Sequence, residues 1–491
     1  MDRFQGEPWR QWAGCSVALL LCGCAVGPEF KRPEPPKETS YTRSSVTLPT
    51  AGPADVQQSL VPGAEIGAHW WELFRSQPLS DVLALAIAGS PTLDAARASL
   101  AQAQEVVIEA RGGLYPQVNV SASAARARIS TESVPGSAQV TANVFSVAPT
   151  VSYAPDVFGG TRRLVEQQSA LAEVQRYELA AAYLSLTGNA VTQAINIASA
   201  REQIKAVQEI LAVDRQNLEL VGVELEIGKA AQADVLSARS VLAGDQALLP
   251  PIRQQLSVSR HALSILVGNA PATWSPPEFD LETLSLPKDL PVSVPSSLAR
   301  ERPDILAAEA QVHAATAAIG VATAQLYPNI TLSASWTQLS ANMGTLFDGT
   351  GGVFSVAADL TAPIFHGGAL DAQRRAAIDA LTVQLATYRQ IVLQAFGQVA
   401  DTLRALQHDA EAVAAQQNAL ETAQSSLQLT QESYAEGQAS FLQVLEAQRL
   451  YQQARLAYAS AKGRRYLDTV QLFVAVGGGW RSWNDPALKA K

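Results

Sequence analysis

Few residues in this sequence combine the types and spacing that catalysis or metal binding requires. The five histidines fall in no metal-ligand spacing, and no nucleophile motif is present; they are His69, His261, His313, His366 and His408. The stretch Gly222–Ala230 faintly resembles a phosphate-binding loop. Its spacing is one residue too long, and Ala230 replaces the Ser or Thr that would contact Mg²⁺. We therefore expect no enzyme activity, no cofactor and no metal site.

The clearest chemistry belongs to Cys24. Arg3 and Arg10 precede an apolar run, residues 12–21, that is too short to span a bilayer as a helix, and Cys24 follows it closely. The stretch 21–24, Leu-Cys-Gly-Cys, resembles a bacterial lipobox, in which the last cysteine is acylated, with palmitate for example, and becomes the first mature residue. The sequence thus predicts a signal peptide over 1–23 and a lipid anchor at Cys24; a short buried hydrophobic segment is the alternative.

The other two cysteines, Cys15 and Cys22, would leave with the signal peptide, so the mature chain has no intramolecular disulfide. Ala25 is compatible with delivery to the outer membrane, because an Asp at this position tends to retain lipoproteins at the inner membrane. Residues 28–62 are rich in Pro, Ser and Thr and are typical of an extended linker. The net charge of −9 argues against a nucleic-acid partner.

Most of the remaining sequence is duplicated. Residues 91–123 align without a gap to residues 303–335 at an offset of 212 (303 − 91), and later stretches align at an offset of 209. Each copy predicts the order helix, strand, loop, strand, very long helix, turn, helix. One architecture is therefore built from two related halves. We place the boundaries at 1–23 for the signal, 24–78 for the anchor and linker, 79–290 and 291–480 for the two repeats, and 481–491 for a tail.

The predicted strands alternate between apolar and small polar residues over about ten positions, as in 117–124, 145–153, 329–336 and 354–364. This pattern fits a transmembrane β-barrel with lipid on one side and water on the other. An antiparallel sheet on a soluble core has the same period. The signal peptide, the lipobox and the small polar face favour the barrel. Arg126 and Arg128 continue the apolar parity, which places them at the outer rim or after a bulge.

The predicted long helices carry a heptad repeat. In the second copy it runs through Val392, Val399, Leu406, Val413, Leu420 and Leu427, and in the first through Ala190, Ile197, Ile204, Leu211 and Leu218. A strict heptad specifies left-handed coiled-coil packing. The stretch 368–434 contains no Pro, and a helix of this length measures about 100 Å. Gly228 and Gly437 end these helices, and 230–266 and 440–476 return as helices.

Four strands cannot close a barrel, and lipid tolerates no open sheet edge. A barrel therefore requires several copies of this chain. The predicted fold class is mainly α, with a long coiled-coil portion and four transmembrane β-strands per chain.

The sequence resembles the outer-membrane factor (TolC-like) family, in its NodT-type branch. The matching stretches are Cys24 to Pro28 with Arg32-Pro33, Trp70-Trp71 with Phe74, Arg302 to Ile305 with Ala308-Glu309, Ala362 to Phe365 with Gly367-Gly368, Tyr434 to Gly437, and Gly477 to Trp480. The resemblance implies a homotrimer in the outer membrane, whose three chains share one twelve-stranded barrel and a helical tunnel in the periplasm. It also implies a passive duct that docks on a periplasmic adaptor and an inner-membrane pump, usually of the proton-driven resistance-nodulation-division type.

By the same resemblance, the helix turns around Gly228 and Gly437 are the periplasmic tips, where the tunnel closes and the adaptor binds. Tyr434 and Glu436 lie beside the second turn. Gln428 stands where the family often has an Asp, and Glu432 is the next acid, so these two are the candidates for the constriction; solvated coiled-coil charges are the alternative for the acids.

The leading hypothesis is a duct that exports small molecules such as drugs. A duct for secreted proteins or for metal ions is the alternative; metal export is disfavoured because Met1 and Met343 are the only methionines. A structural envelope lipoprotein without a pore is the rival from a different class, and the alternating strands argue against it.

Overall fold

The computed structural model describes residues 25–34, 38–44, 46–49, 56–64, 66–129 and 140–489. The predicted signal peptide 1–23 and the predicted lipid site Cys24 lie outside these residues. The chain folds into two compact units, each assembled from several segments. The strand unit contains the described residues up to Pro33 together with Ser99–Gln175 and Ala307–Tyr388, and the hairpin unit contains Glu34–Ala98, Arg176–Leu306 and the described residues from Arg389 onward. Each unit therefore draws on both sequence repeats.

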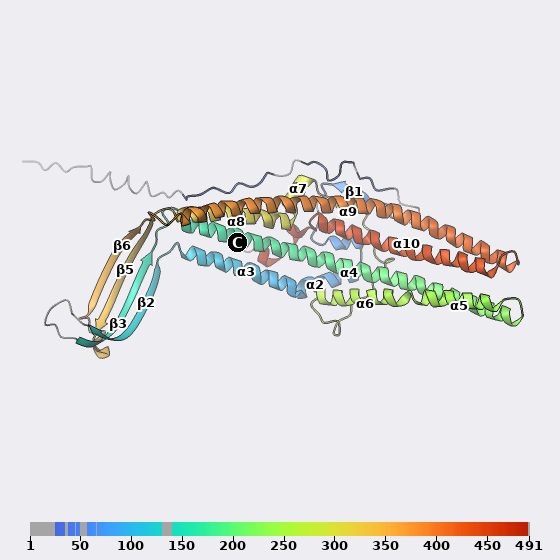
Figure 1. Cartoon of the computed structure of the whole chain (residues 1–491), viewed down its shortest axis with the longest axis horizontal. Helices are drawn as coiled ribbons and strands as arrows, with labels where there is room; N and C mark the ends of the chain where they lie inside the picture. Colours follow the sequence, from blue (N-terminus) through green and yellow to red (C-terminus); the bar gives the residue numbers. More distant parts are fainter. Residues whose placement is uncertain are drawn as a thin grey trace, which may run out of the picture. The chain divides into compact units, whose positions relative to one another are not determined.

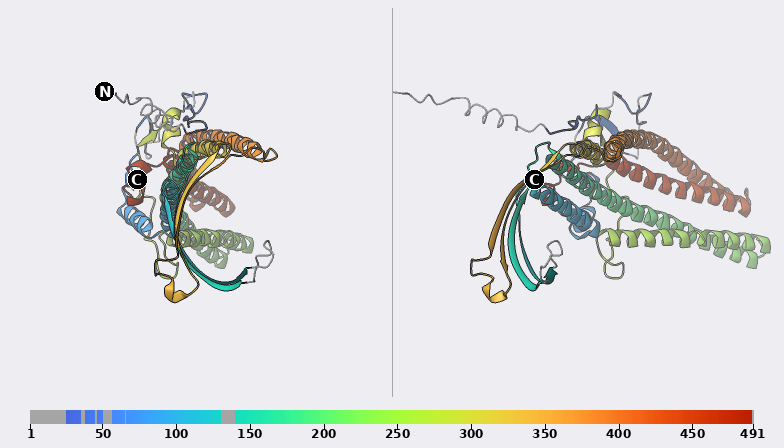
Figure 2. Two further views of the ribbon diagram at one scale, coloured as in Figure 1. Left: turned by 90° about the vertical axis from the view of Figure 1, so that its left-hand side faces the viewer. Right: turned by 60° about the vertical axis from the view of Figure 1, so that its left-hand side comes forward.

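The strand unit contains one four-stranded antiparallel sheet in the order β2-β3-β5-β6, which is drawn in Figure 1. Its strands are β2 (Gln117–Ile129), β3 (Val140–Tyr153), β5 (Asn329–Ser340) and β6 (Gly352–Thr361). The two predicted strand pairs are thus confirmed, and they join through β3 and β5. Figure 2 shows that the strands curve together. Within the described chain β2 and β6 are edge strands, each paired on one side only.

The two faces of this sheet differ as the alternation predicted. On one face Trp336 of β5 lies directly opposite Phe354 of β6, and their side chains are 54% and 72% exposed. On the other face Ser123 lies opposite Ser146, and their hydroxyls are 2.8 Å apart. Large apolar side chains that stay exposed along one face of a sheet have no protein core to cover them, which favours contact with lipid.

Two details of the strands refine the predictions. β2 pairs with β3 without interruption from Gln117 to Ile129, so Arg126 and Arg128 follow no bulge and lie at the far end of the strand. The predicted strand 354–364 is too long at its end, because β6 stops at Thr361. Pro363 lacks the N–H that a sheet ladder needs, which accounts for this end.

The helices of the two repeats match closely. α3 (Pro91–Gly112) and α8 (Pro303–Ala324) contain 22 residues each, and α4 (Gly160–Glu226) and α9 (Ala369–Ala435) contain 67 residues each. The predicted heptad residues Val392, Val399, Leu406, Val413 and Leu427 are buried, at most 9% exposed. The long helices that the sequence predicted are therefore present, and the heptad positions form their packed side.

The return helices differ between the repeats. α10 (Phe441–Ala475) is continuous, as predicted. The prediction of one helix over 230–266 is wrong, because the structure has α5 (Gln232–Gln246) and α6 (Leu249–Leu266) in its place. Pro250 and Pro251 cause the break: their nitrogens cannot donate to the preceding turn, and their rings clash with it, whereas the first turn of a new helix accepts them.

Short elements in the linking segments complete the fold, most of them in the hairpin unit. The strand β1 (Ser59–Pro62) pairs in parallel with β4 (Asp289–Val292). The short helices of the hairpin unit are η1 (Trp70–Phe74), α2 (Gln77–Gly89), α7 (Pro295–Glu301), η3 (Trp480–Ser482) and α11 (Pro486–Lys489). The short helix η2 (Met343–Thr345) belongs to the strand unit. Trp70 is 2% exposed, and its ring stacks on Phe473 of α10 with centroids 5.1 Å apart. The Trp70-Trp71 pair is thus part of the packing of the N-terminal segment.

By length and composition one described helix, α8, could cross a membrane, and α2 with α3 would be a second if this bent pair counts as one span. Because 56% of the apolar window of α8 is buried within the protein, this is weak support for a helical span.

Candidate functional site

The two predicted tip glycines end α4 and α9 with the same backbone turn. Gly228 has a φ of +76° and Gly437 a φ of +77°, a conformation that is costly for residues with a Cβ. In both turns the N–H after the glycine donates to the carbonyl five residues back at 2.8 Å, from Lys229 to Glu224 and from Gln438 to Ser433. This bond belongs to the Schellman motif, which ends a helix sharply. The duplicated sequence therefore produces two equivalent tips.

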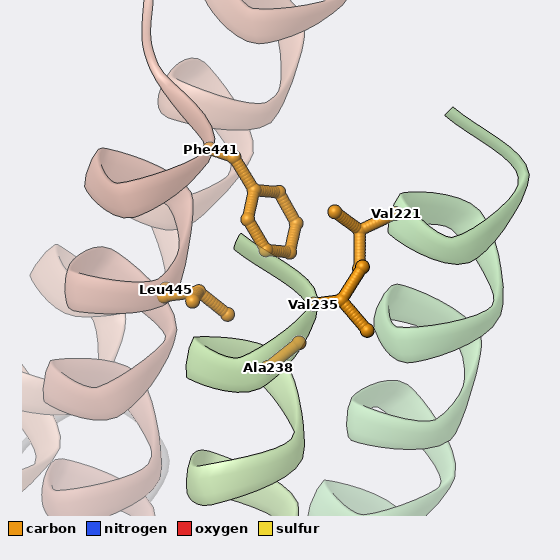
Figure 3. Close-up of a cluster of buried hydrophobic side chains, with 5 residues drawn as sticks. All are labelled: Val221, Val235, Ala238, Phe441 and Leu445. Atoms are coloured by element: carbon orange, nitrogen blue, oxygen red, sulfur yellow. The ribbon is translucent and has the colours of Figure 1, made fainter. Parts of the chain in front are cut away.

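Apolar side chains join the two tips. Val221 of α4, Val235 and Ala238 of α5, and Phe441 and Leu445 of α10 point toward one another in Figure 3, and none is more than 7% exposed. A buried side chain of this size stabilises its contact by about 1.5–3 kcal/mol relative to an exposed one. The hairpin α4/α5 is thus held against the hairpin α9/α10 near both turns.

A polar bond between the hairpins lies beside this cluster. The hydroxyl of Tyr434, at the end of α9, donates to the carboxylate of Glu224, at the end of α4. The ring of Tyr434 packs against Phe441 with centroids 5.9 Å apart. Burial, and then the negative charge of Glu224, raise the pKa of Tyr434 to about 12. The phenol therefore keeps its proton and remains a donor over the whole physiological pH range.

The other predicted tip residues are exposed. The Gln428 side-chain amide donates to the Glu432 carboxylate at 3.1 Å, one turn further along α9. Glu436 instead accepts a bond of 3.1 Å from the side chain of Gln438. The structure therefore brings Gln428 and Glu432 together on one face of α9, whereas Glu436 bonds within the turn at Gly437. Their role in a constriction stays a prediction.

A buried pair of carboxyl groups that was not predicted from the sequence lies further from the turns. Asp214 of α4 is 2% exposed and interacts with Asp245 of α5. Its Oδ1 accepts hydrogen bonds from the side-chain amides of Gln448 and Gln452 of α10, the second at 3.1 Å. Burial, followed by Asp245, raises the pKa of Asp214 to about 7, against the smaller lowering effects of Gln452 and Arg215. Three helices thus meet at a carboxyl pair that readily holds a proton near neutral pH.

A second carboxyl pair joins α9 to α10. Asp409 is 7% exposed, and burial, followed by Asp468, raises its pKa to about 8, while Arg464 and Arg465 act in the opposite direction. Its Oδ2 has no hydrogen-bond partner among the residues that the structure describes. No sequence signal could have identified these pairs, because their members lie 31 and 59 residues apart (245 − 214 and 468 − 409) and follow no motif.

In the strand unit, the segment that follows Cys24 is bound tightly. The N–H of Val26 donates to the carbonyl of Phe158 at 3.1 Å. A Cβ on Gly27 would lie 2.5 Å from the Cα of Gly320, and a Cβ on Gly159 would lie 2.6 Å from the Cα of Ala25. Only glycine fits at these points, so the backbone of 25–27 is in direct contact with α8 and with the joint between β3 and α4.

An ion cluster and a ring stack fix Glu29 and Phe30 of this segment. Arg163 of α4 is 3% exposed, and its guanidinium lies 2.6 Å from the carboxylates of both Glu29 and Glu166. Phe30 stacks on the ring of His313, with centroids 4.3 Å apart, and His313 lies 2.9 Å from Glu166. Burial acts against the charge of Arg163, but the two carboxylates outweigh it and raise its pKa, so the guanidinium stays charged.

No group of three or more His, Cys, Asp or Glu residues that could hold a metal ion occurs in the described part of the chain. Each of the two carboxyl pairs contributes only two acidic side chains, and in the first pair Asp214 also accepts from the amides of Gln448 and Gln452.

Comparisons with known proteins match this architecture. The family model described as "Outer membrane efflux protein" matches residues 82–269 and 294–478. The pyoverdine export outer membrane protein OpmQ of Pseudomonas aeruginosa is 30% identical over 419 residues, which cover 84% of this chain and 88% of that protein. The cation efflux system protein CusC of Escherichia coli is 27% identical over 469 residues, or 95% of this chain and 98% of that protein. The solved structure of the outer-membrane channel OprN is 25% identical, with a TM-score of 0.84, and covers 93% of this chain and 100% of that one.

Proposed function

This chain belongs to the outer membrane efflux protein family, and from that premise we propose that it is the exit duct of a tripartite efflux pump. The family consists of outer membrane channels that are not enzymes. In this proposal three copies assemble, each copy gives four strands to a twelve-stranded barrel, and the helical part lies in the periplasm. The duct conducts small molecules passively to the exterior.

The observation that carries the proposal is the four-stranded sheet with two unpaired edges and one exposed apolar face. An open sheet edge is not tolerated in lipid, so the edges of β2 and β6 must pair with other copies. The face that carries Trp336 and Phe354 suits lipid, and the face that carries Ser123 and Ser146 suits a water-filled lumen.

The helix tips support the position of the closed end. In this proposal Gly228 and Gly437 mark the turns that face the periplasmic adaptor, and Tyr434 and Glu436 lie within the surface that it contacts. Gln428 and Glu432 would line the constriction at the axis. Opening requires the α9/α10 hairpin to separate from α4/α5, so the Tyr434–Glu224 bond would be one of the contacts that opening breaks.

The segment that follows Cys24 supports a lipid anchor. Ala25 packs against Gly159 where β3 joins α4, which in this proposal is the membrane edge that faces the periplasm. Acyl chains on Cys24 would enter the adjoining leaflet there and hold the chain stably. The repeats 79–290 and 291–480 are the proposed building blocks, each giving one strand pair and one hairpin.

The transported substrate separates three versions of the proposal. Export of small organic molecules with an inner-membrane transporter of the resistance-nodulation-division type is the version we favour. Export of metal ions is the alternative, because CusC is named a cation efflux protein. Met343, a soft ligand in the mature sequence, is 72% exposed in η2, outside any cluster of ligands. A duct for secreted proteins is a further version of the alternative.

Conductance and susceptibility measured together test the proposal. The purified protein in a planar bilayer is expected to give discrete channels, and deletion of its gene is expected to raise sensitivity to several organic toxicants. Re-expression of the wild type should restore resistance, whereas a variant without residues 117–153 should not. Sensitivity to copper or silver alone would favour the metal version. Absence of any channel would instead favour an envelope tether without a pore.

A further inference from the structure

Two arginines occupy a face of the sheet that is otherwise apolar. Arg126 and Arg128 have the same parity in β2 as Val118 and Val120, and the uninterrupted pairing of β2 with β3 keeps all four on one face. Both arginine side chains are exposed. A charged side chain on the lipid face is costly at mid-membrane and costs little only near the interface, so the position of these two along the strand matters.

Their position corresponds to the outer interface. About 9–11 tilted residues cross the apolar core of a membrane, and Arg126 and Arg128 are the tenth and twelfth residues of β2. The strand begins at the helical end of the sheet, so its far end faces the exterior. Phe145 lies opposite Ala124, and the next residue pair on this face is Arg126 with Asn143. Aromatic side chains mark the interface, and in the β2/β3 hairpin the polar residues of this face begin directly beyond Phe145.

The polarity of the two faces reverses at the same level. Beyond Phe145 the lipid-side parity carries Arg126, Asn143, Arg128 and Thr141, and the opposite parity carries Ala125, Val144, Ala127 and Ala142. A strand that continued through hydrocarbon would keep its apolar residues on the lipid side. The reversal indicates that this end of the hairpin lies beyond the apolar part of the sheet, with polar surroundings on its outer side.

Among the described residues of the four strands no acid lies beside the two arginines, and Glu132 of the loop between β2 and β3 lies outside the described residues. Asp359 of β6 is the one acidic residue in the four strands, and it lies opposite Thr331 near the other end and on the other face. In the described loop between β5 and β6 the one acid is Asp348. Guanidinium groups bind phosphate through paired hydrogen bonds, and residues two apart on a strand are about 7 Å apart, close enough to hold one phosphate or two adjacent ones.

We propose that Arg126 and Arg128 form a binding surface for the phosphate groups of the lipid A that makes up the outer leaflet of the outer membrane. Each assembled barrel would carry three such surfaces around its rim. The inference rests on the barrel of the proposed function, because only an assembled barrel holds this face against the outer leaflet. Its role is to bind the barrel to its surrounding lipid and fix its depth, independently of what the duct conducts.

Native mass spectrometry of the detergent-extracted assembly with added Kdo2-lipid A tests the inference. The double variant Arg126→Gln/Arg128→Gln is expected to bind the lipid about 30-fold more weakly than the wild type, from about fivefold for each charge near an anionic surface. Arg126→Lys/Arg128→Lys should keep most of the affinity. The control Arg374→Gln/Arg375→Gln, two exposed arginines near the start of α9, should bind as the wild type does. Dephosphorylated lipid A should bind weakly to every variant.

Three results would overturn the inference. These are equal binding by the wild type and the double Gln variant, an equal loss in the α9 control, and a loss that disappears when Asp348 is replaced by Asn. The last would mean that the arginines pair with a loop acid of the assembly. The same spectra report the number of chains. A wild type that is not oligomeric contradicts the proposed barrel, whereas an intact oligomer without selective lipid binding contradicts this inference alone.

Discussion

Tyr434 and Glu224 lie in the last turns of the two longest described helices, and the tyrosine hydroxyl donates a hydrogen bond to the glutamate carboxylate. The two residues lie 210 positions apart, in different repeats. Their bond, with the apolar cluster around Phe441, is what connects the tip of one hairpin to the tip of the other. A duct that opens at these tips must break it.

Replacing Tyr434 by Phe should therefore favour the open duct. The ring packing on Phe441 remains, while a hydrogen bond to a charged acceptor worth about 1.5 kcal/mol is lost, which corresponds to about a tenfold shift toward the open state. Conductance of the protein in planar bilayers measures this shift. Tyr451→Phe is the control, because the hydroxyl of Tyr451 contacts Arg455 of its own helix, α10. Equal conductance in the wild type and Tyr434→Phe would show that this hydrogen bond does not hold the duct closed.

The Gly437 turn should resist substitution. Gly437→Ala places a Cβ at a φ of +77° and is expected to destabilise the protein by about 1 kcal/mol. Gly397→Ala, at an open position inside α9, should stabilise it by about 0.5–1 kcal/mol, because alanine favours the helix. Thermal unfolding followed by fluorescence compares the two. The decisive result is a change in unfolding temperature of opposite sign in the two variants. If Gly437→Ala unfolds at the same temperature as the wild type, the positive φ at this turn does not require glycine.

The buried Asp214 should make stability depend on pH. Its pKa is about 7 in the folded chain and near 3.9 when unfolded, so the native state holds a proton that the unfolded chain releases. The contribution of Asp214 to stability is then greatest below about pH 4, falls as the pH rises to about 7, and levels off above it. Asp214→Asn removes this contribution and should add about 2 kcal/mol at pH 8, while Asp409, whose pKa is raised to about 8, keeps a contribution of the same sign, so the slope is expected to decrease and not to vanish.

The measurement is the unfolding temperature of the solubilised protein between pH 4 and 8. Asp401→Asn is the control, because the side chain of Asp401 is exposed on α9. Asp401→Asn should keep the slope of the wild type. If Asp214→Asn keeps the same slope as well, the pair Asp214–Asp245 does not hold the proton.

A side chain added on α8 at its contact with the segment that follows Cys24 should release this segment from the helix. A Cβ on Gly320 would lie 2.6 Å from the Arg163 side chain and 3.0 Å from the carbonyl oxygen of Val26. Overpacking of this kind costs about 1–3 kcal/mol, which is enough to release a short docked segment. Limited proteolysis near Lys31 should become several-fold faster in Gly320→Ala than in the control Gly397→Ala. Unchanged cleavage would show that the contact does not fix the segment.

The sequence predicted those parts of the fold that depend on local patterns. The alternation around Trp336 and Phe354 indicated the strands, the heptads through Val399 and Leu406 indicated the packed side of α9, and the glycines at 228 and 437 indicated the turns. Each of these signals lies within a short window. The break before Pro250 was equally visible in the sequence, and the prediction of one return helix overlooked it.

The contacts within the site were beyond sequence reasoning. The partner of Tyr434, the pairing of Asp214 with Asp245, and the clamp between Gly27 and Gly320 each join residues that only the tertiary fold brings together. Alternation gives the face of a strand but not the partners of a helix side chain, because many registers of two long helices bury the same heptad. The sequence therefore identifies the residue types in the site, but it does not predict which of these residues contact one another.

The number of chains in the outer-membrane assembly tests the central claim most directly, because four strands with two open edges cannot form a barrel alone. Native mass spectrometry of protein extracted from outer-membrane fractions in mild detergent gives this number. The account predicts a trimer, with each chain beginning at a lipid-bearing Cys24. A stable monomer that carries no bound lipid and needs no detergent would contradict the barrel, and with it the duct.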